Sequence, residues 1–205
     1  MLLCDIGNTS YHFYDAASDY KEDVQDFNPL TCKEQVYYIN VNATIEKQLN
    51  RLDNWIDLSL HVNWQKYYPT MGIDRIMACE AVENALIIDA GSAITVDIVK
   101  DTLHQGGFIT PGVEMMGKSY KRLSSRLDYS FNFDLDLDKM PKNSQDAISY
   151  GFLGILRAEV MRHEMPIILT GGDARRLQKI FPEASIDTLL LFRGMKRLIK
   201  KGRLC

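Results

Sequence analysis

Two short segments of the chain place an aspartate directly before a turn of small and polar residues. They are Asp5-Ile6-Gly7-Asn8-Thr9 and, 84 positions further on (89 − 5), Asp89-Ala90-Gly91-Ser92-Ala93. Each follows an apolar run and leads into a second strand-like stretch. A carboxylate at the end of a buried strand can hold a metal ion, and the N–H groups of such a turn can bind phosphate. The repetition predicts two related half-domains that bind one nucleotide.

In the first segment, Gly7 lets the backbone approach a phosphate closely, and Asn8 and Thr9 add side-chain hydrogen bonds. The carboxylate of Asp5 suits Mg²⁺, which prefers oxygen ligands and keeps several waters. A plain β-hairpin turn is the alternative, because Gly-Asn is a common dipeptide there. In the second segment, Ser92 is placed to bind a phosphate.

A third segment, residues 67–75, combines two tyrosines, a glycine, Asp74 and Arg75 at the predicted start of a helix. An aspartate there can accept a proton from a substrate hydroxyl, while the arginine holds a carboxylate or a phosphate. Asp74 is also well suited to be the N-cap of the helix; the segment alone favours this capping role, and the two roles can coexist.

Glycines mark three more turns. Gly171-Gly172-Asp173 follows the apolar run 167–170 and precedes a helix, where N–H groups attract anions; Asp173 as a simple N-cap is the alternative. Gly106-Gly107 and Pro111-Gly112 bracket a short strand and either approach a ligand or only make turns. Ser144 precedes a long helix as its N-cap or as a substrate contact.

Composition excludes several classes of protein. The 205 residues carry a net charge of −3, with 25% charged and 46% hydrophobic residues, as in a soluble globular protein. This charge gives no general attraction to nucleic acid or anionic membranes. The four cysteines and four histidines lack metal-ligand spacing, and a solvated helix end explains the basic run 196–203. No apolar run reaches membrane-spanning length and no signal peptide is apparent, so a cytoplasmic location is expected.

Strand-like and helical stretches alternate along the chain, which predicts an α/β fold. The strands are expected at 2–5, 10–15, 36–40, 58–64, 86–89, 94–99, 106–112 and 166–170. The helices are expected at 45–52, 75–84, 115–127, 146–164 and after 173. The repeated segment places a boundary near residue 85, between an N-terminal lobe of residues 1–85 and a C-terminal lobe of residues 86–205.

Taken together, these segments resemble the type III pantothenate kinases, a branch of the acetate kinase, sugar kinase, Hsp70 and actin superfamily. The matching motifs span most of the chain: DIGNT (5–9), GIDR (72–75), DAGSA (89–93), GGFITPG (106–112), Ser144 with YG (150–151), and TGGDA (170–174). The resemblance implies duplicated actin-like, ribonuclease H-like domains with mixed sheets and a nucleotide cleft between them. It also implies transfer of the ATP γ-phosphoryl group to the primary hydroxyl of pantothenate, the first step of coenzyme A synthesis.

The resemblance assigns roles to individual residues. Asp74 matches the proton acceptor. Ser92 matches an ATP contact and Asp89 a site for a monovalent cation (K⁺ or NH₄⁺), while the Mg²⁺ role of Asp5 follows from its carboxylate and not from the resemblance. The ATP-binding loop matches Asp5, Ile6, Gly7, Asn8, Thr9, Ser10, Tyr11 and His12. The pantothenate contacts match Tyr68, Gly72, Ile73, Asp74, Arg75 and Ser144.

This chain departs from the family pattern at two hydroxyl residues, because serine replaces the usual threonine at Ser92 and Ser144. It is also shorter than many relatives, which leaves Tyr67 and Tyr68 as competing choices for the substrate tyrosine. The resemblance further implies a homodimer. The alternative function is a non-catalytic, nucleotide-binding regulator on the same fold; retention of Asp5, Asp74 and Arg75 argues against it.

Overall fold

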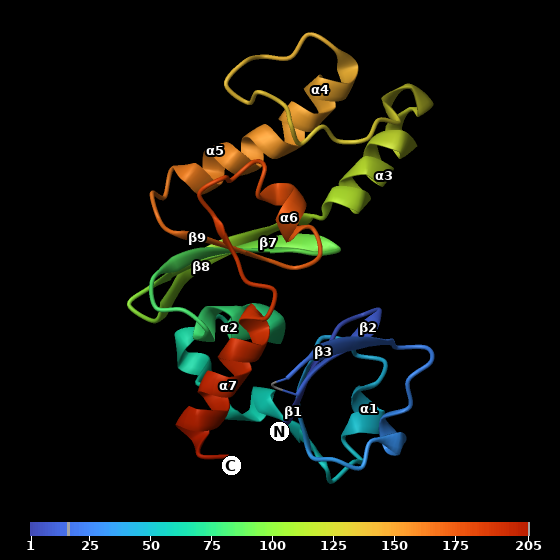
Figure 1. Cartoon of the computed structure of the whole chain (residues 1–205), viewed down its shortest axis with the longest axis vertical. Coiled ribbons are helices and arrows are strands. Elements are labelled where there is room, and N and C mark those ends of the chain that lie inside the picture. Colours follow the sequence, from blue (N-terminus) through green and yellow to red (C-terminus); the bar gives the residue numbers. More distant parts are fainter. Residues whose placement is uncertain (16, 205) are drawn as a thin grey trace. The chain divides into compact units, whose positions relative to one another are not determined.

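The computed structural model describes residues 1–15 and 17–204; Ala16 and Cys205 lie outside the described residues. The chain forms two compact units (Figure 1). The first contains residues 1–82 and the C-terminal segment from residue 189, and the second contains residues 83–188. The sequence-based division at 85/86 differs from this one mainly in assigning the C-terminal segment to the second lobe.

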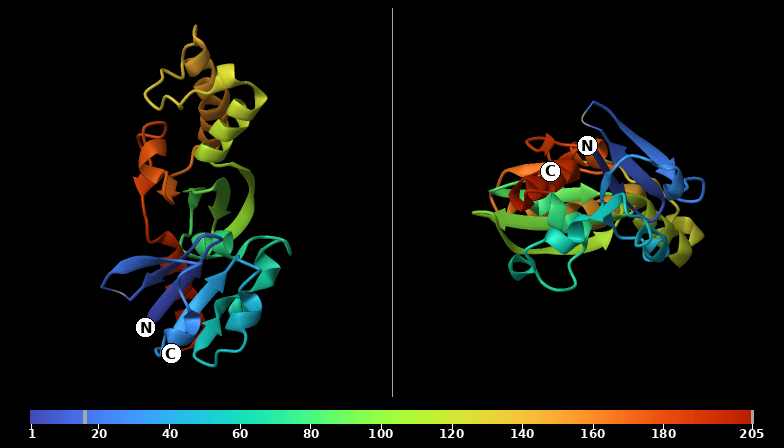
Figure 2. Two further views of the ribbon diagram at one scale, coloured as in Figure 1. Left: turned by 90° about the vertical axis from the view of Figure 1, so that its right-hand side faces the viewer. Right: turned by 90° about the horizontal axis from the view of Figure 1, so that it is seen from below.

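The first unit is built on a five-stranded sheet in the order β3-β2-β1-β4-β5. β1 lies between an antiparallel neighbour, β2, and a parallel neighbour, β4. The N-terminal strands, in blue, are seen from another side in Figure 2. The strands are β1 (Leu2–Ile6), β2 (Ser10–Tyr14), β3 (Asp19–Asp23), β4 (Val36–Asn40) and β5 (Trp55–Asp57).

The second unit repeats this plan in the order β10-β9-β6-β7-β8. Here β6 lies between antiparallel β7 and parallel β9, as β1 lies between β2 and β4. The strands are β6 (Ala85–Ala90), β7 (Ala93–Lys100), β8 (Leu103–Pro111), β9 (Ile167–Thr170) and β10 (Ser185–Ile186). The predicted α/β fold with duplicated mixed sheets is confirmed.

Each unit has its own hydrophobic core. In the first, Ile6 and Tyr11 pack with Trp55 and other apolar side chains of the sheet. In the second, Leu86 and Ile88 of β6 pack against Phe152 and Leu156 of the long helical segment. The central strand of each sheet is thus fixed by burial, and this fixes the turn that follows it.

The helices differ in length from the prediction. The expected helix 146–164 is a continuous helical segment made of α4 (Ser144–Ser149), a π-helical turn (Tyr150–Gly154) and α5 (Ile155–Met161). The remaining helices are α1 (Glu46–Leu49), α2 (Ile73–Glu80), α3 (Val113–Leu123), α6 (Ala174–Leu177) and α7 (Leu190–Gly202). α7 contains most of the basic run at the C-terminus and lies beside α2 in the first unit (Figure 1).

The predicted strand 58–64 is wrong. Two 3₁₀ turns, Leu58–His61 and Trp64–Lys66, occupy this stretch, and the strand is the preceding β5. The side chain of Asp57 accepts the N–H of Ser59, and that of Asn63 accepts the N–H of Gln65. Such local side-chain hydrogen bonds stabilise turns at the expense of strand pairing, and they override the alternating apolar pattern.

Candidate active site

The first turn connects β1 to β2 in the first unit. Asp5 is half-buried at the penultimate position of β1, and the N–H of Gly7 donates to the carbonyl of Ser10 at 3.0 Å. Asn8 and Thr9 are exposed at the tip of this turn, where their side chains are accessible to a ligand.

Three other residues of the predicted ATP-binding loop point their side chains elsewhere. Ile6 and Tyr11 belong to the core, and burial raises the pKa of Tyr11 to about 12, so its hydroxyl stays protonated. The ring of His12 contacts the carboxylate of Asp19 at 2.8 Å. Burial lowers the pKa of His12 and outweighs the opposing effect of Asp19. The backbone of Ile6 and Tyr11 is therefore the part left to contact a nucleotide.

The second turn connects β6 to β7 in the second unit. Asp89 is again penultimate in its strand and half-buried, and the N–H of Gly91 donates to the carbonyl of Ala93 at 2.9 Å. Ser92 is exposed at the tip. The duplicated sequence thus produces a duplicated backbone, with a carboxylate followed by a tight turn.

Two glycines from distant parts of the sequence enclose this second turn. Gly112 donates its N–H to the carbonyl of Ser92 at 2.9 Å, and a Cβ on Gly112 would overlap with the carbonyl oxygen of Gly91. Gly171 has a φ of +84°, and a Cβ there would overlap with a carboxylate oxygen of Asp89. Only a residue without a side chain fits at either position. These contacts fix where the carboxylate and the turn lie.

The predicted substrate segment surrounds the start of α2. The helix begins at Ile73 with Gly72 as its N-cap, so Asp74 lies in the first turn and the expected N-cap role for it is wrong. The carboxylate of Asp74 accepts the N–H of Arg75 at 2.8 Å. It also lies over Gly72, where a Cβ would overlap with it. Gly72 therefore leaves space for this carboxylate, which lies at the positive end of the helix dipole.

The two consecutive tyrosines occupy different environments. The hydroxyl of Tyr68 accepts a hydrogen bond from the guanidinium of Arg75 at 2.5 Å, and Tyr68 is 41% exposed. Tyr67 is buried, and its hydroxyl donates to Glu80 at 3.0 Å. Tyr68 and Asp74 therefore place a hydroxyl and a carboxylate at one helix start, and the guanidinium of Arg75, a residue only 5% exposed, contacts that hydroxyl.

Ser144 is the first residue of α4 and is exposed. Its predicted alternative as the N-cap is wrong, because the side chain of Asn143 caps the helix by accepting the N–H of Asp146 at 2.9 Å. Hydrogen bonds from Asn132 and Asn143 lower the pKa of Asp146. The hydroxyl of Ser144 is thus not used to cap the helix.

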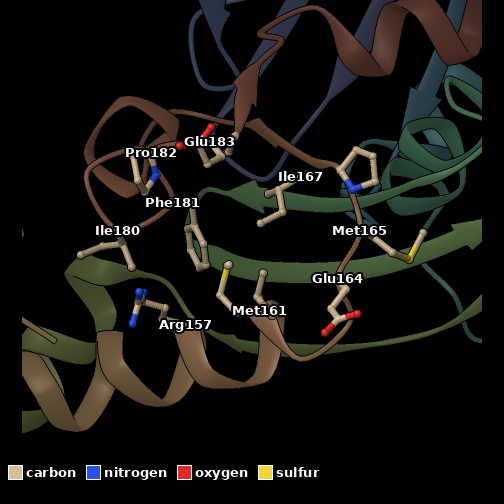
Figure 3. A pocket seen from close by; sticks show the side chains of 12 residues that line it. Arg157, Met161, Glu164, Met165, Ile167, Ile180, Phe181, Pro182 and Glu183 are labelled. Atoms are coloured by element: carbon tan, nitrogen blue, oxygen red, sulfur yellow. The ribbon is translucent and has the colours of Figure 1, made fainter. Parts of the chain in front are cut away.

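Within the second unit, the structure brings Asp89 beside Gly171 and the Ser92 turn beside Gly112. A separate pocket of about 300 Å³ in this unit lies between α5 and residues 180–184 and contains none of the predicted site residues. Figure 3 shows Met161 and Phe181 lining it, with the charged Arg157 and Glu164 also on its wall.

Comparisons with known proteins assign the chain to a family. The family model described as type III pantothenate kinase matches residues 35–163, more than half of the chain. A protein of Sulfurimonas denitrificans named type III pantothenate kinase is 60% identical over 205 residues, and the match covers 100% of both chains. The chain belongs to the type III pantothenate kinase family.

Two solved structures agree with this fold. A Campylobacter jejuni protein, described as a Baf family transcriptional activator, has a TM-score of 0.90 and 36% identity, with 100% of both chains covered. A Sinorhizobium meliloti protein, named as a 2-dehydro-3-deoxygalactonokinase, has a TM-score of 0.61. It is only 8% identical, with 98% of this chain and 96% of that chain covered, so it shows the fold alone.

Membership in the family confirms the predicted activity. The chain is a kinase that phosphorylates pantothenate in coenzyme A biosynthesis. It uses ATP together with a divalent metal ion as the phosphoryl donor. The predicted actin-like fold is also confirmed, since a sugar kinase shares it across both units. Among the described residues, none of the helices combines the length and apolar character needed to cross a membrane.

Sequence reasoning missed Glu80, which is buried at the last position of α2. The signal was present in the sequence, because Glu80 is a charged residue within the apolar run from Ile76 to Val82. Buried carboxylates are rare unless they are paired, so its position indicates a partner that the local sequence does not reveal.

Proposed function

We propose that Asp74 is the catalytic base that accepts the proton of the pantothenate hydroxyl. The observation that supports this role is the carboxylate at the start of α2, seated over Gly72 and adjacent to the guanidinium-bearing Arg75. Phosphoryl transfer depends on positioning and on charge neutralisation more than on covalent catalysis. A carboxylate held in one place satisfies the first requirement.

Tyr68 and Arg75 are the proposed contacts for the polar groups of pantothenate, together with Gly72, Ile73 and Ser144. The guanidinium of Arg75 suits the carboxylate of pantothenate, and its hydrogen bond to Tyr68 orders both side chains. Burial of Tyr67 against Glu80 favours Tyr68 as the substrate tyrosine.

ATP is proposed to contact the first loop, residues 5–12, and Ser92. The half-buried carboxylate of Asp5 is the proposed ligand for Mg²⁺, whose preference for oxygen ligands it fits. A monovalent cation, K⁺ or NH₄⁺, is proposed at Asp89, where a carboxylate and nearby backbone carbonyls supply oxygen donors. When bound, these ions neutralise phosphate charge, while the chain's own N–H groups and hydroxyls orient the nucleotide.

The enzyme is further proposed to be a cytoplasmic homodimer, as the family resemblance implies. Analytical ultracentrifugation tests the oligomeric state directly. A species of twice the chain mass at micromolar concentration is expected, and a monomer across the whole concentration range would contradict it.

The decisive experiment for the site is an ADP-release assay with pantothenate, with sugars and acetate as control acceptors. Asp74→Asn is expected to lower kcat by about 10²- to 10⁴-fold, the usual contribution of general-base catalysis. The exposed Asp53→Asn is the matched control and should retain activity. Full turnover by Asp74→Asn with an unchanged unfolding transition would remove it as the base.

The alternative function, a nucleotide-binding regulator without turnover, draws only on the description of the Campylobacter jejuni relative as a transcriptional activator. The kinase names of the full-length relatives weigh against it. The same assay separates the two functions, because a regulator would bind ATP and release no ADP when pantothenate is added.

A further inference from the structure

Residues 67 and 68 send their side chains to opposite sides of the backbone. Tyr67 has an extended conformation, with φ −133° and ψ 156°, and successive side chains alternate in extended chain. Tyr68 therefore reaches the guanidinium of Arg75, while Tyr67 reaches the carboxylate of Glu80. The position of the proposed substrate tyrosine is thus linked to that of a buried neighbour.

Glu80 is held at both carboxylate oxygens. The hydroxyl of Tyr67 donates to Oε1 at 3.0 Å, and Nζ of Lys201 donates to Oε2 at 2.7 Å. The side chain of Glu80 is only 7% exposed. Arg197, one helical turn before Lys201 on α7, also donates to the backbone carbonyl of Glu80 at 3.4 Å.

Burial raises the pKa of Glu80, but the hydrogen bonds from Lys201 and Tyr67, with the positive charge of Lys201, outweigh it, so the pKa is lowered. The carboxylate is therefore charged at neutral pH. A charged acceptor makes a stronger hydrogen bond with a hydroxyl than a neutral one does.

α7 is in turn fixed against α2 and the sheet. A Cβ on Gly194 would overlap with the carbonyl oxygen of Met77, so the two helices touch through their backbones. At the C-terminal end, the hydroxyl of Tyr37 on β4 donates to the carbonyl of Leu204 at 2.7 Å. Lys201 thus approaches Glu80 from a helix that has little freedom to move.

We infer that Glu80 is a positioning residue for pantothenate binding, and that it acts through Tyr67 on the segment that presents Tyr68 and Arg75. The inference rests on the proposed substrate role of Tyr68 and Arg75. Residues 67–72 connect the hydrogen bond at Glu80 to the first turn of α2. Releasing Tyr67 frees one end of this segment, while the ATP-binding loop and the second unit keep their own contacts.

Tyr67→Phe tests this inference because it removes one hydroxyl and keeps the ring. The expected result is a rise of about three- to tenfold in KM for pantothenate, within the range of one ordinary intramolecular hydrogen bond. KM for ATP should stay unchanged. Tyr20→Phe, at an exposed tyrosine of the same unit, is the matched control and should change neither value.

Glu80→Gln and Glu80→Ala extend the test. Glutamine still offers Tyr67 an oxygen acceptor and should retain most pantothenate affinity, whereas alanine should reproduce the effect of Tyr67→Phe. Adding Tyr67→Phe to Glu80→Ala should raise KM no further, because both remove the same contact. A merely structural role would lower the unfolding temperature and leave the two KM values, or their ratio, unchanged.

Tyr68→Phe separates failure of this inference from failure of the proposed site. If Tyr68→Phe raises KM for pantothenate and Tyr67→Phe does not, only the positioning role of Glu80 is overturned. If Tyr67→Phe raises it and Tyr68→Phe does not, Tyr67 is itself the substrate contact and the inference is overturned. If neither changes it, the assignment of this segment to pantothenate is wrong as well.

Discussion

The two strand–turn–strand segments of the enzyme share a backbone plan and differ in their surroundings. In each, the first strand lies between a parallel and an antiparallel neighbour, and an aspartate is penultimate in that strand. In each, the glycine of the turn donates its N–H across the turn, at 3.0 Å for Gly7 and 2.9 Å for Gly91. The repeat is therefore one of topology and of hydrogen bonding.

The surroundings are unequal. A Cβ on Gly7 would meet its nearest neighbour, the carbonyl oxygen of Ser10, at an ordinary 3.7 Å. The second turn instead has Gly112 on its backbone and Gly171 against Asp89, both without space for a methyl group. The glycine within each turn has equal room, because a Cβ on Gly91 would also meet its nearest neighbour at 3.7 Å. The difference lies in the two further glycines that enclose the second turn, and these are the positions that should not tolerate a side chain.

The largest effect is expected at Gly171. Gly171→Ala adds a methyl group at positive φ that overlaps with Asp89 and with the backbone of Ala90. The free energy of unfolding should fall by about 2–4 kcal/mol, from backbone strain and overpacking together.

Its control is the adjacent glycine. At Gly172 a Cβ would have no atom within 4 Å. Gly172→Ala should therefore be neutral or stabilising by up to about 1 kcal/mol. Urea denaturation followed by circular dichroism measures both variants, and equal losses would show that the second turn is not enclosed as described.

A somewhat smaller effect is expected at Gly112. Gly112→Ala pushes the turn at Gly91 and Ser92 and should lower the free energy of unfolding by about 1–3 kcal/mol. Because Ser92 is a proposed ATP contact, KM for ATP should rise more than KM for pantothenate. Gly7→Ala, a change within the first turn where a Cβ meets no atom closer than 3.7 Å, should alter the free energy of unfolding by less than about 1 kcal/mol. A larger loss for Gly7→Ala than for Gly112→Ala would reverse the comparison.

The sequence was sufficient for the turns and insufficient for what encloses them. Apolar runs ending in Asp5 and Asp89 identified the two central strands, because burial on both faces gives a strand a strong local signal. Gly112 approaches the backbone of Gly91 so closely that a Cβ would not fit, although the two residues are 21 positions apart (112 − 91). No local sequence pattern encodes such a close approach. The resemblance to a family supplied the roles of these glycine motifs without their contacts.

The same limit explains the errors in the first unit. The stretch 58–64 alternates apolar and polar residues like a strand, but Asp57 and Asn63 redirect it into 3₁₀ turns. The basic residues of the run 196–203 are exposed along α7, as a solvated helix end predicts, but the packing of the preceding Gly194 on Met77 of α2 was not predicted. Long-range packing decides such cases, as it also decided that Tyr67 is the buried tyrosine of the pair.

Asp5 and Asp89, the aspartates of the two turns, should bind different ions. Asp5→Asn is expected to raise the Mg²⁺ concentration for half-maximal activity by about tenfold, as losses in a metal's coordination environment commonly do. Asp89→Asn should leave the Mg²⁺ dependence intact and abolish stimulation by K⁺ or NH₄⁺ over Na⁺. ADP-release titrations with each ion measure both. The same ion response in both variants would mean that the duplicated carboxylates have one role.

The smallest expected effect is a loss of stability at low pH in the first unit. There the buried carboxylate of Glu80 on α2 pairs with Lys201 on α7. The pKa of Glu80 is lowered in the folded protein, so Glu80 binds a proton less readily when folded than when unfolded. Its contribution to stability is therefore complete above the usual glutamate value of 4.5 and is lost as the pH falls through the lowered value. Lys201 is largely exposed, so solvent screening limits the contribution to about 1 kcal/mol or less.

Trp55 and Trp64 both lie in the first unit, so tryptophan fluorescence during urea denaturation reports on it. Between pH 6 and pH 3.5, the free energy of unfolding of Glu80→Gln should fall less than that of the unmodified enzyme, because glutamine does not titrate. In the second unit, the contacts of Gly112 with the turn involve only backbone atoms, so the loss caused by Gly112→Ala should be the same at both pH values. Identical pH slopes for Glu80→Gln and the unmodified enzyme would show that the charge of Glu80 does not stabilise the first unit.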